Sequence, residues 1–400
     1  MNAINTLFVL LCAAMVLLMT PALAVFYAGL CRRKSGVDIM MQVWICLAVV
    51  GLLWAVVGFS LAFGSDTAGG LLGGTDFFLL QGVGLEENPA YGGGIPFIAY
   101  FFLQTAYAVI TPALICGATA ERMTLKAWTL FAPLWSLVVY IPLTHMTWGG
   151  GLFSRLGLVD WGGGVVIHAS AGFAALAAAL VLKKRRVPDN TPCDMAQVSI
   201  NCGILLFGWL AFNAAGALEV NGQAVYSMVN SFLGAMVGMA VWVALTALRE
   251  KRPSFLSAMI GFLAGLVAVT PAAGVTNAGG AMALSLLVSI FCYLCINMLR
   301  PRLGFDDAFD VWGLHGMGGL AGTILLPLFA DSALVEFPGG TGAQVLIQAG
   351  CGVITALFSF AATWALLKLI GLAVPLRLPE SVEGRVDEAV YQESMGDCGC

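Results

Sequence analysis

Three histidines are the side chains of this 400-residue chain whose chemistry is most informative. His168 and His315 each lie inside a long apolar stretch, whereas His145 follows a threonine and precedes a Met-Thr-Trp sequence, where we expect a structural or interfacial role. Burying an imidazole without full compensation costs about 1–3 kcal/mol. Neutral imidazoles donate through one nitrogen and accept through the other, and they can also relay protons. A lone buried histidine usually serves packing, but two at matching places favour a path for a small polar solute.

Two aspartates begin the apolar stretches that carry these histidines. Asp160 precedes His168, and Asp310 precedes His315. The simplest expectation for each is an N-cap that accepts hydrogen bonds from free backbone N–H groups, and we assign Asp310 as a structural cap. Each has a second interpretation, in which its charge favours cations, at the outer entrance for Asp160 and at the inner end near Asp306-Asp307 for Asp310.

Three aromatic residues lie near one end of their apolar stretches, the end assigned below to the outside. They are Tyr107, Trp148 and Phe212. Aromatic belts are common at the membrane interface, so their positions alone favour interfacial anchors. A ring face can instead bind a cation through its quadrupole, with a contribution of about 0.5–2 kcal/mol.

The composition identifies the elements that must hold these side chains. Hydrophobic residues make up 60% of the chain and charged residues 10%, far below the roughly 25% of soluble domains. This predicts an all-α polytopic membrane protein, and no nucleic-acid footprint is present. Runs of about 20 apolar residues predict eleven transmembrane segments, near residues 5–30, 38–62, 96–118, 127–145, 161–182, 196–216, 224–248, 255–272, 278–299, 310–330 and 343–371.

Basic residues predict the orientation, because Lys and Arg in short loops stay on the cytoplasmic side. If alternate loops face the cytoplasm, beginning with residues 31–36, then 17 of the 18 basic residues lie inside and only Arg155 lies outside. The N-terminus is then outside and the C-terminus inside, in the inner (cytoplasmic) membrane. The first segment lacks a basic start, so we expect a retained helix and not a signal peptide.

Segments one to five and six to ten resemble two related halves of opposite topology, an arrangement that places a pathway at their interface. The matching sequences are Ile110-Thr111-Pro112-Ala113 with Val269-Thr270-Pro271-Ala272, and Asp160-Trp161-Gly162 before His168 with Asp310-Val311-Trp312-Gly313 before His315. We expect one transmembrane domain over residues 1–371 and a cytoplasmic tail over residues 372–400.

Cysteines and catalytic groups give little sign of other chemistry. The eleven cysteines lie mostly in apolar runs, where they act as small hydrophobes, so a disulfide framework is not expected. Cys398 and Cys400 are expected to belong to a reduced tail and not to a metal or redox site. No nucleophile–base set or metal cluster stands out, so neither an enzyme nor a cofactor is expected.

Several motifs spread over nearly the whole chain carry a family resemblance. They are Phe26-Tyr27-Ala28-Gly29-Leu30, Gly117-Ala118-Thr119-Ala120-Glu121-Arg122-Met123, Trp148-Gly149-Gly150-Gly151, Asp160 through His168, Phe207-Gly208-Trp209, Phe212-Asn213-Ala214, and Asp306-Asp307 with Asp310 through Gly316. Together they resemble the ammonium transporter, methylammonium permease and Rhesus family. The resemblance implies transport of ammonium or ammonia across the lipid membrane by a homotrimer with one pore per subunit. It also implies a PII signalling protein as a possible partner at the cytoplasmic face.

The resemblance also implies a role for each site residue. Ammonium is recruited at an outer aromatic site, a phenylalanine pair gates the pore, and twin histidines line a hydrophobic conduit. The corresponding residues are Trp148, Tyr107, Asp160 and the position of Gly216 for recruitment, Phe212 and Tyr107 for the gate, and His168 and His315 for the conduit and proton relay.

Two departures from the family pattern affect the outer site. The family motif usually reads Phe-Asn-Ala-Gly-Ser, and its serine hydroxyl helps to bind ammonium. This chain has Gly216 at the serine position, which predicts weaker recruitment. Leu103 and Tyr107 also stand where phenylalanine is usual.

Two other functions remain open at this stage. An ammonium sensor with little flux is favoured by the missing hydroxyl at Gly216, although the sequence ends at Cys400 without a kinase or cyclase domain. A channel for another small neutral molecule, such as carbon dioxide, would also suit an apolar conduit.

Overall fold

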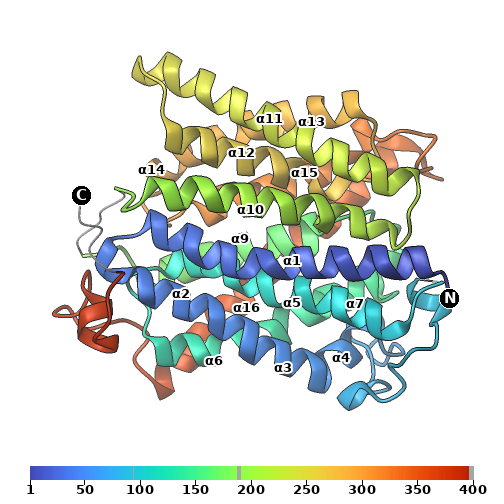
Figure 1. Cartoon of the computed structure of the whole chain (residues 1–400), viewed down its shortest axis with the longest axis horizontal. Helices are drawn as coiled ribbons and strands as arrows, with labels where there is room; N and C mark the ends of the chain where they lie inside the picture. The colour runs from blue at the N-terminus through green and yellow to red at the C-terminus, as the bar shows by residue number, and fades with distance from the viewer. Residues whose placement is uncertain (93, 187–190, 396–400) are drawn as a thin grey trace.

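The protein is a bundle of helices packed side by side, and the computed structural model describes residues 1–92, 94–186 and 191–395 (Figure 1). Cys398 and Cys400 lie outside the described residues. Within that part of the chain, eleven helical units are long and apolar enough to cross a membrane, which confirms the predicted fold class. They are Ala3–Leu30, Arg33–Phe63, Phe97–Thr119, Leu125–Arg155, Gly164–Leu182, Met195–Ala217, Gly222–Glu250, Phe255–Ala272, Ala278–Leu303, Trp312–Phe329 and Gly340–Ala373.

Several units contain more than one helix, because single turns of π- or 3-10 helix interrupt them. The α-helices are α1 (Ala3–Leu30), α2 (Gly36–Ile45), α3 (Gly51–Leu53), α4 (Phe59–Phe63), α5 (Phe97–Thr119), α6 (Leu125–Trp135), α7 (Ile141–Trp148), α8 (Leu152–Arg155), α9 (Ser170–Leu182), α10 (Met195–Ala214), α11 (Gly222–Glu250), α12 (Phe255–Val269), α13 (Ala278–Leu294), α14 (Arg300–Leu303), α15 (Gly318–Phe329) and α16 (Gly340–Ala373). The π-helical turns are Cys46–Val50, Trp54–Gly58, Ser136–Tyr140, Gly164–Ala169, Cys295–Leu299, Trp312–Met317 and Asp387–Tyr391. The 3-10 turns are Arg33–Ser35, Phe78–Leu80, Pro89–Tyr91, Ala215–Ala217 and Thr270–Ala272.

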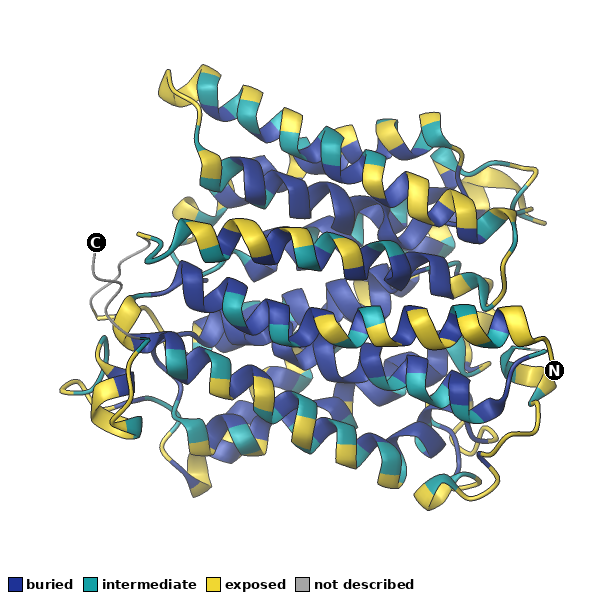
Figure 2. Ribbon diagram, in the orientation of Figure 1, coloured by how far each residue is buried: buried dark blue, intermediate teal, exposed yellow. Residues whose placement is uncertain are grey.

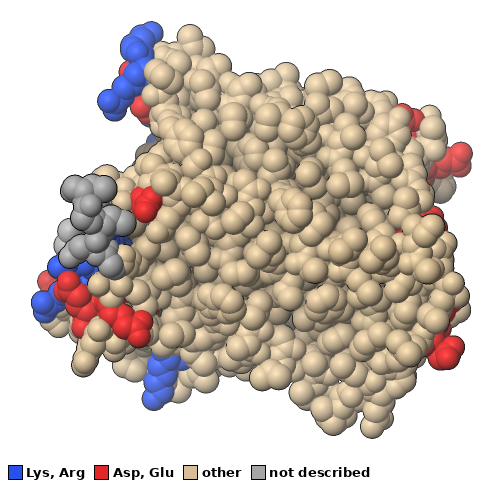
Figure 3. Space-filling view, in the orientation of Figure 1, with Lys and Arg blue, Asp and Glu red and all other residues tan. Residues whose placement is uncertain are grey.

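Burial and charge follow the pattern of a membrane protein. Buried residues fill the middle of the bundle, and the outward faces of α1, α10 and α11 carry exposed residues (Figure 2). Large apolar side chains such as Leu11, Phe207 and Phe232 are among the exposed ones, as lipid-facing helices require. Charged side chains lie at the two ends of the molecule in Figure 3, and the Lys and Arg visible there lie at only one of them.

The chain that follows α16 folds back across the end of the bundle at which α1 finishes. The backbone N–H of Leu378 donates to the carbonyl of Arg122 over 2.7 Å. Glu383 accepts hydrogen bonds from Arg377, and Asp387 accepts two from the first turn of α2, one of them from Val37 over 2.9 Å. This segment is therefore part of the packed structure up to residue 395.

Two π-helical turns meet at the centre of the bundle and bring the two halves together. Gly164–Ala169 leads into α9, and Trp312–Met317 leads into α15. A Cβ atom at Gly172 would overlap the backbone of Gly316, and one at Gly319 would lie 2.6 Å from the Cβ of His168. Each half thus places a glycine, four residues after its own histidine, against the histidine turn of the other half.

We predict that Gly172→Ala lowers the stability of the protein. The added methyl group has no room against the Gly316 backbone, and such overpacking typically costs about 1–3 kcal/mol. Thermal unfolding of the purified protein in detergent measures the effect. Gly350→Ala in α16 is the matched control, because nothing lies within 4 Å of its added Cβ. Equal melting temperatures for the two variants would contradict the close contact between the turns.

Candidate functional site

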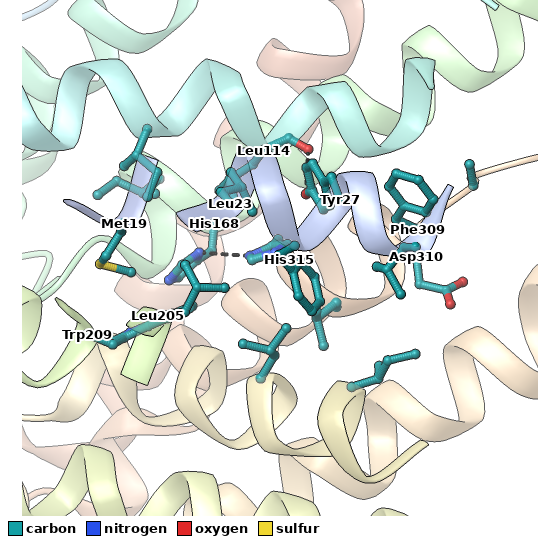
Figure 4. A pocket seen from close by; sticks show the side chains of 18 of the residues that line it. Met19, Leu23, Tyr27, Leu114, His168, Leu205, Trp209, Phe309, Asp310 and His315 are labelled. Carbon is teal, nitrogen blue, oxygen red and sulfur yellow. Dashed lines mark hydrogen bonds between the residues drawn. The ribbon is translucent and has the colours of Figure 1, made fainter. Parts of the chain in front are cut away.

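The two predicted conduit histidines contact each other directly. Their Nδ1 atoms lie 3.1 Å apart, and their ring centroids are 5.2 Å apart at an interplanar angle of 29°. His168 is 2% exposed and His315 is 5% exposed. Figure 4 shows the imidazoles pointing toward one another, although they come from different halves of the chain.

This hydrogen bond constrains the protonation of the two rings. One Nδ1 must carry the proton and the other must accept it, so two neutral rings adopt opposite tautomers. The Nε2 atom is then an acceptor on the donating ring and a donor on the accepting ring. Nε2 of His168 is buried and has no hydrogen-bond partner among the described residues. The pair therefore offers one donor and one acceptor to a small solute.

A narrow apolar cavity of about 110 Å³ surrounds the histidine pair. Leucine and isoleucine side chains, including Leu23, Leu114 and Leu205, form much of its wall. Trp209 stacks on His168 with ring centroids 5.3 Å apart, and its N–H donates to the hydroxyl of Thr270, away from the histidines. Apart from the histidines, the middle of this cavity presents a hydrocarbon surface.

A second and wider cavity lies on the side where the chain begins. Its volume is about 330 Å³, and Tyr107, Trp148, Trp161 and Gly216 are among its lining residues. We call this cavity the outer vestibule. The indole N–H of Trp148 donates to the carbonyl of Asp160 over 2.9 Å, which fixes the ring at the vestibule wall. The structure thus brings three of the predicted recruitment residues to one cavity.

Tyr107 and Phe212 separate the outer vestibule from the histidine cavity. Tyr107 lines the vestibule, and Phe212 lines the histidine cavity. Their ring centroids are 4.6 Å apart in an edge-to-face arrangement, and the Tyr107 hydroxyl donates to the Phe212 carbonyl over 2.9 Å. The two residues are therefore in contact, and each forms part of the wall of one cavity.

Asp160 caps a helix and does not line the vestibule. Its carboxylate accepts hydrogen bonds from four backbone N–H groups, those of residues 163 to 166, at 2.6–3.2 Å. Burial raises the pKa of Asp160 to about 6, although these four bonds act in the opposite direction. These contacts support the expected role of Asp160 as a cap. Its link to the vestibule is the hydrogen bond that its carbonyl accepts from Trp148.

The assignment of Asp310 as the cap of the corresponding turn is wrong, because Asp307 is the cap. The carboxylate of Asp307 accepts from the Trp312 N–H over 2.7 Å, five residues further on, just as Asp160 accepts from Val165. Asp160 and Asp307 each lie eight residues before their histidine. Asp310 has a positive φ of 60° and occupies the place of Gly163, whose φ is 95°.

Asp310 instead forms an ion pair with Arg300 at the far end of the histidine cavity. Arg300 also donates to the Asp307 carbonyl over 2.8 Å. Figure 4 shows Asp310 beside Phe309 at the end opposite Trp209. This end of the cavity is thus polar, and both of its charges already have partners.

His145 lies outside both cavities. Its Nδ1 atom lies 2.9 Å from the Ala62 carbonyl, and its Nε2 atom lies 3.8 Å from Asp66, which also pairs with Arg155. These contacts connect α4 and the loop that follows it to α7 and α8. The position agrees with a structural role for this third histidine.

Three residues of the site were not predicted: Trp161 and Arg300, which line the cavities, and Asp307, which caps the second histidine turn. Asp307 carried a usable signal, because the spacing of eight residues between aspartate and histidine occurs in both halves. Trp161 lies inside a recognised motif and Arg300 lies shortly before another, but only the packing of distant segments places them at the cavities.

In the described part of the chain, eleven helices long and apolar enough to span a membrane surround a buried histidine pair and two cavities, an arrangement typical of a multi-pass membrane transport protein. The family model described as Ammonium Transporter Family matches residues 7–395. The ammonium transporter of Aquifex aeolicus (strain VF5) is 36% identical over 394 residues, covering 97% of this chain and 92% of that protein. The chain therefore belongs to the ammonium transporter family, and it is a transport protein for ammonium and not an enzyme.

Solved structures show the same architecture. Candida albicans Mep2 matches with a TM-score of 0.88 at 30% identity, over 95% of this chain and 87% of the other. A sensor Amt protein matches with a TM-score of 0.89 at 25% identity, over 96% of both chains. The family fold therefore extends over almost the entire chain.

We predict that Asp160→Ala destabilises the protein more than Asp160→Asn. Alanine leaves four buried N–H groups without their acceptor, and each unsatisfied buried donor typically costs about 1–3 kcal/mol. Asparagine keeps one acceptor oxygen. Thermal unfolding in detergent tests this, with Glu336→Gln as a control that removes an exposed carboxylate. If Asp160→Ala and the wild type have the same melting temperature, the carboxylate does not stabilise the turn.

Proposed function

We propose that the protein recruits ammonium in the outer vestibule, removes its proton before the aromatic barrier and passes ammonia along His168 and His315. The observation that carries this proposal is the histidine pair, which supplies matched hydrogen-bonding atoms inside an otherwise apolar cavity. The proposed path begins in the outer vestibule, passes the aromatic barrier of the Tyr107 and Phe212 rings, follows the histidine pair and ends at the polar far end of the cavity.

Recruitment depends on the aromatic wall of the vestibule. Trp148 and Tyr107 lie with ring centroids 6.2 Å apart, so one small cation can approach both rings. A cation near such ring faces gains about 0.5–2 kcal/mol. Asp160 supports the site by holding Trp148 and the turn behind it.

Deprotonation follows from the chemistry of the cavity beyond the barrier. Ammonium has four N–H donors and a full charge, whereas the hydrocarbon wall offers neither an anion nor enough acceptors. Moving an unpaired ion into such surroundings costs several kcal/mol or more. Ammonia is neutral, so the charge penalty disappears when water in the vestibule accepts the proton.

Ammonia fits the hydrogen-bonding pattern of the histidine pair. Its lone pair can accept from the Nε2–H of one ring, and its N–H groups can donate to the free Nε2 of the other ring. Phe212 and Tyr107 act as the gate that separates this path from vestibule water. The path ends at Arg300 and Asp310, where ammonia meets water and regains a proton.

The proposal includes an orientation and two partners. We place the N-terminus outside, the tail over residues 372–400 in the cytoplasm and the domain over residues 1–371 in the inner membrane. The gathering of basic side chains at one end of the molecule supports this orientation (Figure 3). A homotrimer with one pore per subunit, and a PII protein at the cytoplasmic face, are proposed from membership of the family.

A second candidate function is an ammonium sensor with little flux. The likeness to a sensor Amt protein and the absence of a side chain at Gly216 favour it. A sensor would bind ammonium without turnover in vesicles. A transporter gives sustained flux that scales with the amount of reconstituted protein.

We predict that His168→Ala and His315→Ala each reduce ammonium flux about tenfold or more. Each change removes one of the two matched polar contacts, and a lost contact of about 1.4 kcal/mol corresponds to a factor of ten. Ammonium-evoked current and labelled methylammonium uptake in reconstituted vesicles, together with size-exclusion profiles, measure the effect.

His145→Gln is the matched control for this experiment, because that histidine lies outside both cavities. Its flux per assembled protein should equal that of the wild type. Unchanged flux and selectivity in both His168→Ala and His315→Ala would reduce the pair to packing residues.

We predict that a reporter fused after residue 395 is active only in the cytoplasm. The reverse orientation would place about 17 basic residues outside, against the positive-inside rule. Parallel fusions to one reporter that works in the cytoplasm and another that works outside it decide the matter. Activity of the external reporter at the C-terminus would reject the orientation.

A further inference from the structure

Trp161 occupies the part of the outer vestibule where a side chain at position 216 would begin. A Cβ atom added to Gly216 would lie 2.9 Å from Nε1 and 3.0 Å from Cε2 of the indole. A Cβ atom on Gly274 would overlap the indole as well. The ring therefore packs against two glycines from different segments. A side chain at position 216 would collide with the indole in this position.

The indole is also held in place by hydrogen bonds. Its N–H donates to the Asn213 carbonyl over 2.8 Å, and the backbone N–H of Trp161 donates to the Pro271 carbonyl over 3.1 Å. The Asn213 side chain in turn donates to Ser231 over 2.8 Å. Because its own N–H is already engaged, Trp161 presents an apolar ring to the vestibule and no free donor.

Two other vestibule residues carry acceptors without a partner. Oε1 of Gln104 and Oγ1 of Thr147 are buried and make no hydrogen bond within the described residues. Both side chains are more than nine-tenths buried. Each oxygen has almost no accessible surface, so neither meets a cation in the vestibule, and recognition there depends on the aromatic rings.

We propose that Trp161 determines the cation selectivity of the outer vestibule and favours a primary alkylammonium, such as methylammonium, relative to ammonium. The charged end of the alkylammonium lies near Trp148 and Tyr107, and its methyl group packs on the indole of Trp161. Aromatic walls recognise alkylated ammonium ions in this way in other proteins. Ammonium gains less from this ring, because it has no methyl group to pack on the indole. This inference rests on the outer recruitment site proposed above.

The experiment compares two half-saturation concentrations in reconstituted vesicles, one for ammonium-evoked current and one for methylammonium as substrate or competitor. We expect Trp161→Leu to raise the methylammonium value relative to the ammonium value by about threefold or more. Trp161→Met also lacks a ring and should shift the ratio likewise, so it serves if the leucine variant does not assemble. A ratio within twofold of the wild type in the assembled variant overturns the proposal.

Position 216 supplies the matched test. Gly216→Ser alone should shift the ratio in the same direction as Trp161→Leu, because the new Cβ displaces the indole. The double variant Trp161→Leu with Gly216→Ser has room for the hydroxyl, so its ammonium half-saturation should fall below that of Trp161→Leu. Equal half-saturations in Gly216→Ser and the wild type would overturn the coupling between the two positions.

Trp148→Leu separates this inference from the recruitment site itself. If Trp148→Leu raises both half-saturations while Trp161→Leu leaves their ratio unchanged, only the selectivity role of Trp161 fails. If Trp148→Leu also leaves both values unchanged, the outer recruitment site fails and the selectivity role fails with it.

Discussion

The hydrogen bond between His168 and His315 is the interaction on which the rest of the structure depends. Two buried imidazoles would each leave polar atoms unsatisfied in hydrocarbon, so each ring reduces that cost for the other. The bond also requires two segments 147 residues apart to meet within hydrogen-bonding distance. The absence of side chains at Gly172 and Gly319 makes this approach possible, since any side chain there would overlap the opposite histidine turn. Close packing and hydrogen bonding therefore both depend on the contact between the two histidine turns.

The sequence predicted the bundle well because hydrophobic length is a local property. Each of the eleven apolar runs became a spanning unit whose ends differ from the prediction by a few residues, apart from the fourth, which continues through α7 to Arg155. The histidine pair was also predictable, because identical residue types recur in both halves. The cap at Asp307 was missed because residue type was matched before spacing: Asp310 has the right type, yet it lies at the left-handed position of the turn. Backbone conformation at a single residue decided which carboxylate faces the helix.

The outer vestibule depends on contacts between distant segments, which the sequence of any one segment does not predict. The missing hydroxyl at Gly216 was visible in the sequence, but its cause was not. Trp161, Gly216 and Gly274 belong to three separate parts of the chain, and only their packing explains why a glycine is needed. An apparent loss of a binding group is thus better understood as the exchange of a hydroxyl for an aromatic ring. Such exchanges have no sequence signature of their own, because each residue is unremarkable in its own segment.

The carboxylates around the histidine pair explain why the proposed path suits a neutral solute. Asp160 is engaged by four backbone N–H groups, Asp307 by the N–H of Trp312, and Asp310 by Arg300. None of them supplies a free negative charge to the cavity, so nothing there would stabilise an imidazolium or an ammonium ion. The aspartates therefore influence selectivity indirectly. Asp160 and Asp307 stabilise the turns that position the histidines, and the carboxylates remain paired with N–H groups or with Arg300. A cation that enters from the vestibule finds its favourable contacts before the aromatic barrier and loses them beyond it. On the proposed path, the barrier is accordingly the point at which releasing a proton becomes easier than carrying the charge further.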